Sequence, residues 1–207
     1  MKTMMLFTSV LFALALSCAS AQQGDAQYDV LTYSAGSSGY EKYLVSVGSY
    51  TTNGAIYQKK YTDYLYGIAK ILLSEKKMDV IEQSIGFYYD KKENRKDKLF
   101  LTVDIRMPDQ EVRSAESYEN NARAMMGLSL RGVMDVLHSC QTVLSENEVK
   151  GVVMGLAWQR GGARELINVW VSKEDLALFY AKSLTLNEVV IRGTVTNTEG
   201  RIIRLTL

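Results

Sequence analysis

Apolar residues occupy every second position from residue 99 to residue 107, and the residues between them, such as Thr102, Asp104 and Arg106, are mostly polar. Successive side chains of a β-strand point to opposite faces, so this pattern predicts a strand with one buried face and one wetter face. Residues 85–89 alternate in the same way. Together the two stretches predict a β-hairpin joined by a charged connector.

A second alternating stretch, 152–158, carries Gly151, Gly155 and Ala157 on its other face, where small side chains let another element approach closely. The turn QRGGAR (159–164) and the apolar stretch 166–171 complete a second predicted hairpin. Further strands are expected at 28–33 and 43–50 near the N-terminus, and at 189–196 and 201–207 at the C-terminus.

Two stretches have the three-to-four-residue spacing of an amphipathic helix, 57–73 and 114–144. In the longer one, apolar residues fall within an arc of about 120° when residues are placed 100° apart. Cys140 lies near the centre of that arc, which predicts a buried thiol. His138 lies nearly opposite, which predicts an exposed imidazole. A Ser-Lys-Glu-Asp sequence beginning at Ser172 predicts the start of a shorter helix.

Helices therefore alternate with hairpins along the chain. This order predicts an α+β fold, a largely antiparallel sheet with helices packed on one face, and the helix-plus-hairpin units are a candidate duplication. No long polar linker divides the chain. We expect residues 40–207 to form a single domain and residues 22–39 to form a flexible N-terminal lead.

The first 21 residues have the pattern of a bacterial export signal. Lys2 precedes an uncharged apolar stretch, and Ala19-Ser20-Ala21 supplies the small residues that signal peptidase requires, which predicts cleavage before Gln22. Ala15-Leu16-Ser17-Cys18 is a loose version of the lipoprotein cleavage box, so lipidation of Cys18 is the alternative. The apolar stretch is too short to cross a bilayer, and we expect no membrane span in the mature chain.

Charge and composition narrow the function classes. Removing residues 1–21 takes away Lys2 and leaves 23 basic residues against 23 acidic ones. A neutral chain with interspersed charges offers no electrostatic reason to bind nucleic acid. The composition, 47% hydrophobic and 23% charged, is typical of a globular domain.

The residues offer little for catalysis. The chain has one histidine and two cysteines, too few for the common zinc sites or for a convincing nucleophile–histidine pair. No phosphate-binding loop is present, and we expect no catalytic residues, no metal and no cofactor. An Asp/Glu-dependent hydrolase built from Asp104 with Glu165 or Asp175 remains an alternative.

Two groups of residues are candidates for a binding surface. Nine of the 13 tyrosines lie between Tyr28 and Tyr66, and exposed aromatic rings with polar tips suit sugars, peptides and protein interfaces. The candidates are Tyr33, Tyr40 and Tyr66 in this region, and Trp158, Arg160 and Arg164 around the second hairpin turn. Burial in the core is the alternative for the tyrosines, and solvation of a hairpin tip is the alternative for the arginines.

The segments SAGSSGYEKYLVSVGSY and AIYQKKYTDYLYGIAKILL resemble, over about residues 36–73, the opening of exported proteins of the LPP20-like lipoprotein class. In that class a strand with V-x-S/G-x-G/S character leads into a helix with regularly spaced small residues. The resemblance implies a cell-envelope protein, often anchored by a lipid, and it transfers no catalytic residues to this chain.

The leading hypothesis is an exported, non-enzymatic protein of the bacterial periplasm or cell envelope that acts through contact with an envelope protein partner. A binding module for an envelope glycan, a peptidoglycan fragment or a lipid is the second hypothesis. The Asp/Glu-dependent hydrolase is the third.

Overall fold

The alternating stretch 99–107 forms an inner strand of a single sheet. The structure is a computed structural model, and it describes residues 28–34, 36, 39–49, 52–89, 98–108 and 116–207. The strands are β1 (Asp79–Val80), β2 (Gly86–Tyr89), β3 (Leu99–Arg106), β4 (Val149–Arg160), β5 (Ala163–Ser172), β6 (Thr194–Thr196) and β7 (Ile202–Ile203). Their order is β1-β3-β4-β5-β6-β7, and β2 pairs with β3 beside β1.

The sheet is largely antiparallel, which confirms the predicted α+β fold. The exception is the β3–β4 pair, which runs parallel with Val103 opposite Met154. A parallel pair needs a crossover connection, and the helices after β3 provide it. Both predicted hairpins are present: β2 pairs with β3, and β4 pairs with β5 across a turn at Gly161 and Gly162, which both have positive φ.

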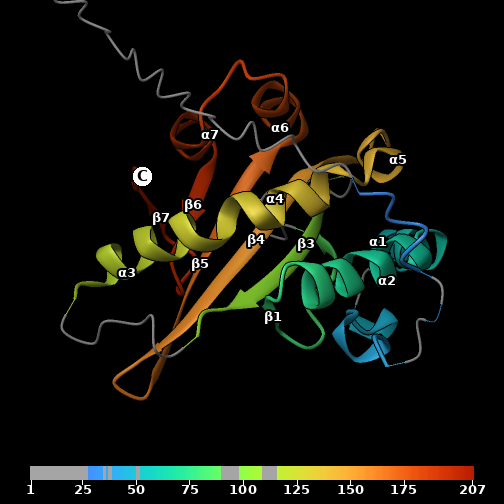
Figure 1. Cartoon of the computed structure of the whole chain (residues 1–207), viewed down its shortest axis with the longest axis horizontal. Coiled ribbons are helices and arrows are strands. Elements are labelled where there is room, and N and C mark those ends of the chain that lie inside the picture. Colours follow the sequence, from blue (N-terminus) through green and yellow to red (C-terminus); the bar gives the residue numbers. More distant parts are fainter. Residues whose placement is uncertain (1–27, 35, 37–38, 50–51, 90–97, 109–115) are drawn as a thin grey trace, which may run out of the picture.

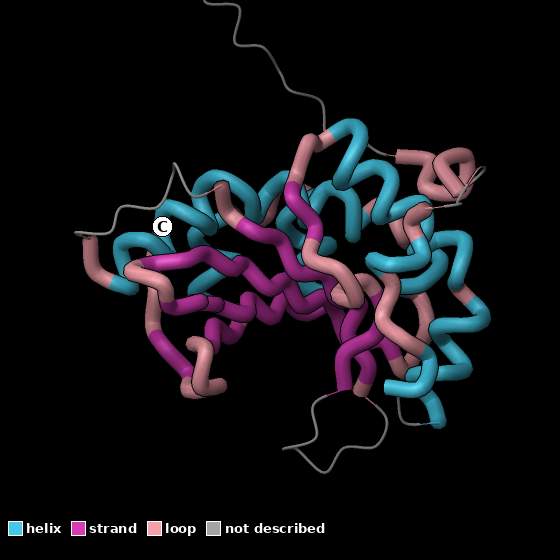
Figure 2. Tube along the Cα trace, turned by 90° about the horizontal axis from the view of Figure 1, so that it is seen from below, coloured by secondary structure: helices cyan, strands magenta, loops and turns pink. Residues whose placement is uncertain are grey.

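The helices line one side of the sheet (Figures 1 and 2). They are α1 (Thr52–Lys60), α2 (Thr62–Lys70), α3 (Tyr118–Met125), α4 (Arg131–His138), α5 (Gln141–Leu144), α6 (Lys173–Tyr180) and α7 (Leu186–Arg192). Two π-helical turns, η3 (Ile71–Glu75) and η6 (Met126–Leu130), follow α2 and α3. In Figure 1, α4 crosses the strands. In Figure 2 the sheet is an arch with helices along its convex side.

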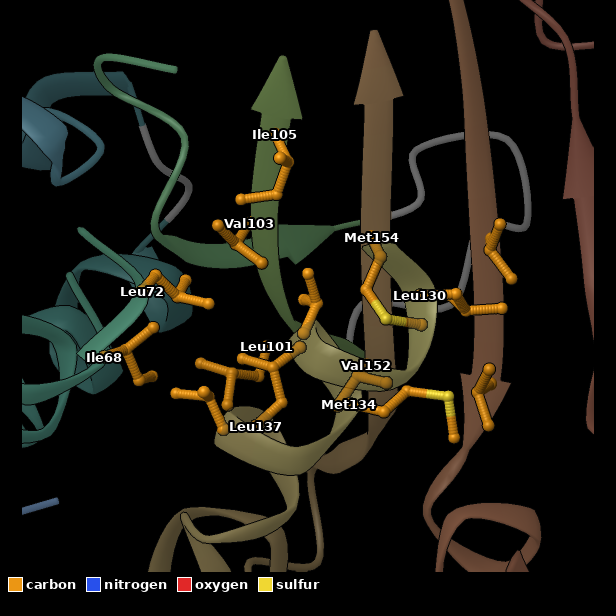
Figure 3. Close-up of a cluster of buried hydrophobic side chains, with 14 of the residues drawn as sticks. Ile68, Leu72, Leu101, Val103, Ile105, Leu130, Met134, Leu137, Val152 and Met154 are labelled. Atoms are coloured by element: carbon orange, nitrogen blue, oxygen red, sulfur yellow. The ribbon is translucent and has the colours of Figure 1, made fainter. Parts of the chain in front are cut away.

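The core fills the layer between helices and sheet. Leu101 and Val103 of β3 and Met154 of β4 point toward the helices, where Ile68 and Leu137 meet them (Figure 3). All five side chains are fully buried. Burying a side chain of this size contributes about 1.5–3 kcal/mol each, so this layer fixes the helices on one face of the sheet.

The predicted 114–144 helix is interrupted. In the described part it begins at Tyr118, where the Ser117 side chain accepts a hydrogen bond from the Asn120 N–H, and it continues through η6 to His138. Cys140 then leaves the helical conformation, with ψ of 47°, and α5 starts after it. Cys140 is fully buried, as predicted.

Two of the predicted strands are wrong, and a third, 189–196, is present only as β6. Residues 28–33 form a turn, and the described part of 43–50, residues 43–49, forms short 3-10 turns with one isolated bridge between Leu44 and Ile85. Residues 189–192 belong to α7, because Thr185 and Glu188 form a reciprocal capping box that starts a helix ahead of them. The C-terminal pairing is limited to β6 and β7.

Part of the expected flexible lead packs on the domain. Val30 is 2% exposed, and a Cβ added to Gly67 of α2 would collide with the Val30 carbonyl oxygen. The Tyr28 N–H donates to Ser139 Oγ at 3.1 Å. Residues 28–34 therefore belong to the same structural unit as the residues that follow.

Candidate functional site

The side of the sheet opposite the helices carries the candidate site. Alternation along β3 to β6 sends one set of side chains to this side, which we call the concave face (Figure 2). It comprises Tyr88, Phe100, Thr102, Asp104, Arg106, Val153, Gly155, Ala157, Gln159, Arg164, Leu166, Asn168, Trp170, Thr194 and Thr196. No described helix lies inside the arch in Figure 2.

An aromatic cluster occupies one end of the concave face. The rings of Tyr88 and Phe100 lie 5.0 Å and 5.1 Å from the ring of Trp170, both nearly perpendicular to it. Such edge-to-face pairs add about 0.5–1.5 kcal/mol each beyond burial and hold the rings in place. Tyr88 is 45% exposed and Trp170 is partly exposed, so the cluster presents aromatic surface to solvent.

Asp104 lies beside this cluster on β3. A Cβ added to Gly155, its partner on β4, would collide with the Asp104 carboxylate, so the absence of a side chain there provides the space for it. Burial raises the pKa of Asp104, although the charge of Arg164 and a hydrogen bond from the Gly155 backbone oppose the shift. The carboxylate is thus held close to the sheet, with Arg164 as the nearby charge.

Uncharged polar side chains surround the aromatic and acidic groups. Asn168 of β5 is paired in register with Gly155 on one side and with Thr196 on the other, and Thr102 is next to Asp104 on the same face. The Trp170 Nε1–H donates to Thr196 Oγ1 at 3.5 Å. The face therefore combines aromatic rings, one carboxylate, amides and hydroxyls.

The predicted contact site around the second hairpin turn is divided between the two faces. Trp158 is fully buried on the helix side, which corrects its assignment to the surface, and its Nε1–H donates to Glu165 Oε2 at 2.6 Å. Arg160 forms an ion pair with the same carboxylate at 2.5 Å. Arg164, by contrast, lies on the concave face, so the structure does not bring Trp158 and Arg164 together.

The predicted tyrosine surface is mostly packing. Tyr33, Tyr40 and Tyr66 are half-buried and pack against the core. Tyr33 makes an edge contact with Tyr28, with 6.4 Å between ring centroids. Burial raises the pKa of Tyr66, and the negative charge of Glu41 adds to the shift. These three tyrosines therefore pack around the core, which was the alternative to a binding surface.

The carboxylates considered for a hydrolase lie apart. Asp104 and Glu165 project from opposite faces of the sheet, since Glu165 pairs in register with Trp158. Asp175 accepts from Arg192 at 2.7 Å and interacts with Ser172 at the start of α6. Among these three residues the structure offers no adjacent carboxylate pair for acid–base chemistry.

The single histidine is not exposed as predicted. His138 is half-buried, and its ring stacks on Tyr180 with centroids 3.8 Å apart. The Tyr180 hydroxyl donates to Asp135 Oδ1 at 2.8 Å, and Lys76 pairs with the other Asp135 oxygen at 3.3 Å. Because α6 folds over the end of α4, a periodicity argument within one helix could not place His138 correctly.

A hollow of about 580 Å³ lies along α3. Its polar side chains bond to one another: Asn120 donates to Glu116 at 2.7 Å, and Arg123 donates to Asn120 at 3.1 Å. These groups are satisfied locally, so the hollow presents no polar group aimed at a ligand.

Within the described part of the chain, no helix is long and apolar enough to cross a membrane, and no three metal-ligating side chains come together. Cys18 lies outside the described residues. No protein-family model, no curated protein and no solved structure matched this chain. The resemblance to LPP20-like lipoproteins and the possible duplication therefore stay predictions.

Proposed function

We propose that this protein is an exported, non-enzymatic module of the bacterial cell envelope that holds an envelope ligand on its concave face. The observation that carries the proposal is the aromatic cluster beside Asp104 and Asn168 on a face that no described helix covers. Aromatic surface with a few convergent polar groups is the usual composition of a ligand site.

A ligand is favoured over a protein partner by the distribution of exposed apolar side chains. Exposed leucine and isoleucine side chains are scattered over separate elements. Examples are Leu31 in the first turn, Leu128 in η6, Ile191 in α7 and Leu207 at the C-terminus. The concave face instead concentrates Tyr88 and Trp170 next to polar groups. Contact with an envelope protein stays a prediction with no surface assigned to it.

The binding test uses two defined probes, muramidase-solubilised peptidoglycan and phospholipid vesicles. Ligand binding stabilises the folded state by mass action, so we expect one probe to raise the thermal midpoint of the protein that begins at Gln22. The Trp170→Ala variant should lose that increase, whereas Leu128→Ala, which changes an exposed residue of the helix layer, should keep it. An unchanged midpoint with both probes, or equal increases in both variants, would refute the proposal.

Export is tested by the mass of the protein recovered from envelope fractions of its own cells. A chain that begins at Gln22 supports cleavage after Ala21, and a chain that begins at a lipid-bearing Cys18 supports the anchored alternative. Recovery of the full-length chain from the cytoplasmic fraction would contradict export.

A further inference from the structure

We propose that the ligand of the concave face is an uncharged oligosaccharide whose sugar units pack against Trp170 and Tyr88 while Asp104 and Asn168 bind its hydroxyl groups. This inference rests on the proposed function and specifies the ligand class. It follows from three properties of the concave face: aromatic surface, balanced charge and a high density of neutral polar groups.

The aromatic cluster provides the apolar part of the site. A sugar ring has faces of C–H groups that pack on aromatic rings, and Tyr88 and Trp170 both expose part of their rings to solvent. Phe100 supports Trp170 from the side at 5.1 Å. The three rings come from β2, β3 and β5, so the strand pairing itself fixes their arrangement.

The charges of the concave face nearly cancel. Arg164 lies within electrostatic range of Asp104, and Arg106 pairs with Asp79 at 3.5 Å. An anionic lipid headgroup would require a surplus of basic side chains, which these pairs do not supply. The balance of charge suits a ligand that is polar but uncharged.

The neutral polar groups distinguish a sugar from an acyl chain. Asn168, Thr194 and Thr196 lie around the aromatic cluster on the same face, whereas Thr102 is only 7% exposed. An acyl chain packed there would separate these groups from water without giving them hydrogen bonds, which is costly. A sugar offers hydroxyls to Asn168, Thr194 and Thr196, and Asp104 can accept from hydroxyls in charge-assisted hydrogen bonds.

The two tryptophans make the test direct. The chain contains only Trp158 and Trp170, and Trp158 is fully buried on the helix side. A saturable change in tryptophan fluorescence on adding a sugar therefore reports on Trp170. The probes are the tetramer of N-acetylglucosamine and maltotetraose, titrated to millimolar concentration into the protein that begins at Gln22, with isothermal calorimetry as a second readout.

We expect at least one of the two tetrasaccharides to bind. Tyr88→Ala and Asn168→Ala should each weaken that binding about tenfold, the loss expected for one stacked ring or one set of hydrogen bonds. Tyr66→Ala is the matched control, because it removes a half-buried tyrosine from the other side of the molecule. Circular dichroism and the thermal midpoint of each variant verify that it is folded.

The outcomes separate the two proposals. If neither tetrasaccharide binds but phospholipid vesicles bind in a Trp170-dependent way, the concave face keeps its function and the saccharide assignment is wrong. If a tetrasaccharide binds equally well to wild type, Tyr88→Ala and Asn168→Ala, the sugar site lies elsewhere and both proposals are wrong.

Discussion

The buried carboxylate of Asp104 lowers the stability of the folded protein when it is ionised. Burial raises its pKa above the usual value of 3.8, which means that the folded protein holds the proton more tightly than the unfolded chain. The ionised carboxylate therefore lowers stability at neutral pH, and that cost decreases as the pH falls toward the raised pKa. Asn at this position keeps an oxygen that can accept from the Gly155 N–H.

We accordingly expect Asp104→Asn to raise the thermal midpoint by a few degrees at pH 7 and by less at pH 4. The measurement is the difference in thermal midpoint between variant and wild type, taken from circular dichroism melts at each pH. Other titrating groups affect both proteins equally, so they cancel in this difference. If the thermal midpoint of the variant at pH 7 lies below that of wild type, the ionised carboxylate stabilises the folded protein and the prediction is wrong. Loss of ligand binding in the same variant would be a separate result.

Cys140 should be chemically silent in the folded protein. Its side chain is fully buried, its Sγ–H donates to the Val136 carbonyl at 3.8 Å, and burial raises the pKa of the thiol. Because the thiolate is the reactive form, we expect no reaction with a water-soluble disulfide reagent until the protein unfolds. Thr142→Cys, an exposed position two residues on, should react at once, and fast labelling of wild type would contradict the burial of Cys140.

At the scale of elements, one carboxylate joins the first helices to the sheet. Glu146 precedes β4 and accepts from Lys60 Nζ at 2.6 Å, from the Tyr57 hydroxyl at 3.4 Å and from the Tyr61 hydroxyl. The hydrogen bond with Lys60, followed by that with Tyr61, lowers the pKa of Glu146. The contribution of this carboxylate to stability is therefore present above pH 4.5 and is lost as the pH falls through the lowered pKa.

Glu146→Gln should consequently reduce the thermal midpoint at pH 7 and make little difference at pH 3. Glu82→Gln is the control, because the Lys42–Glu82 pair has similar length, 2.8 Å, but both side chains are more than half exposed. Exposed ion pairs contribute little, so we expect almost no change in that variant. Equal effects of the two substitutions would mean that Glu146 acts as an ordinary surface charge.

The elements also show what local pattern could and could not predict. Strict alternation identified β3 and β4, and helical spacing identified the buried side of α4. The strand expected at 43–50 failed because only Tyr43 and Leu44 there pack on the core, while Val47 is 41% exposed in a 3-10 turn. The start of α7 could have been recognised, since Thr185 and Glu188 have the spacing of a capping box that outweighs the strand preference of Val189 and Val190.

The candidate site was harder to predict because it depends on strand order. Alternation along 99–107 already placed Asp104 on the wetter face. Nothing in the sequence showed that β3 would pair in parallel with β4, which sets Gly155 under the carboxylate. Nor did it show that Tyr88 and Trp170, far apart in the chain, would meet across the sheet.

In the whole molecule, the two sides of the sheet differ in what covers them. The helices cover the convex side of the sheet, and buried side chains of both layers form the core, so the concave face is not needed to bury the helices (Figure 2). Within this face Val153 and Ala157 are buried, whereas Tyr88, Trp170 and Thr194 keep surface that a ligand can reach. This division explains how aromatic rings and a carboxylate can remain partly exposed without loss of a well-packed interior.

The extent of the folded unit can be tested by shortening the chain. Val30 is 2% exposed and packs on Gly67, so a chain that begins at Tyr40 loses this contact and leaves apolar surface of α2 in water. We expect it to be less stable than the chain that begins at Gln22 by about 2–3 kcal/mol, as measured by urea unfolding. Val30→Ala in the longer chain should give part of the same loss, because it removes two buried methyl groups. Equal stability of the two chains would place the N-terminal boundary of the domain at residue 40, and residues 28–34 would then be an accessory segment that the fold does not require.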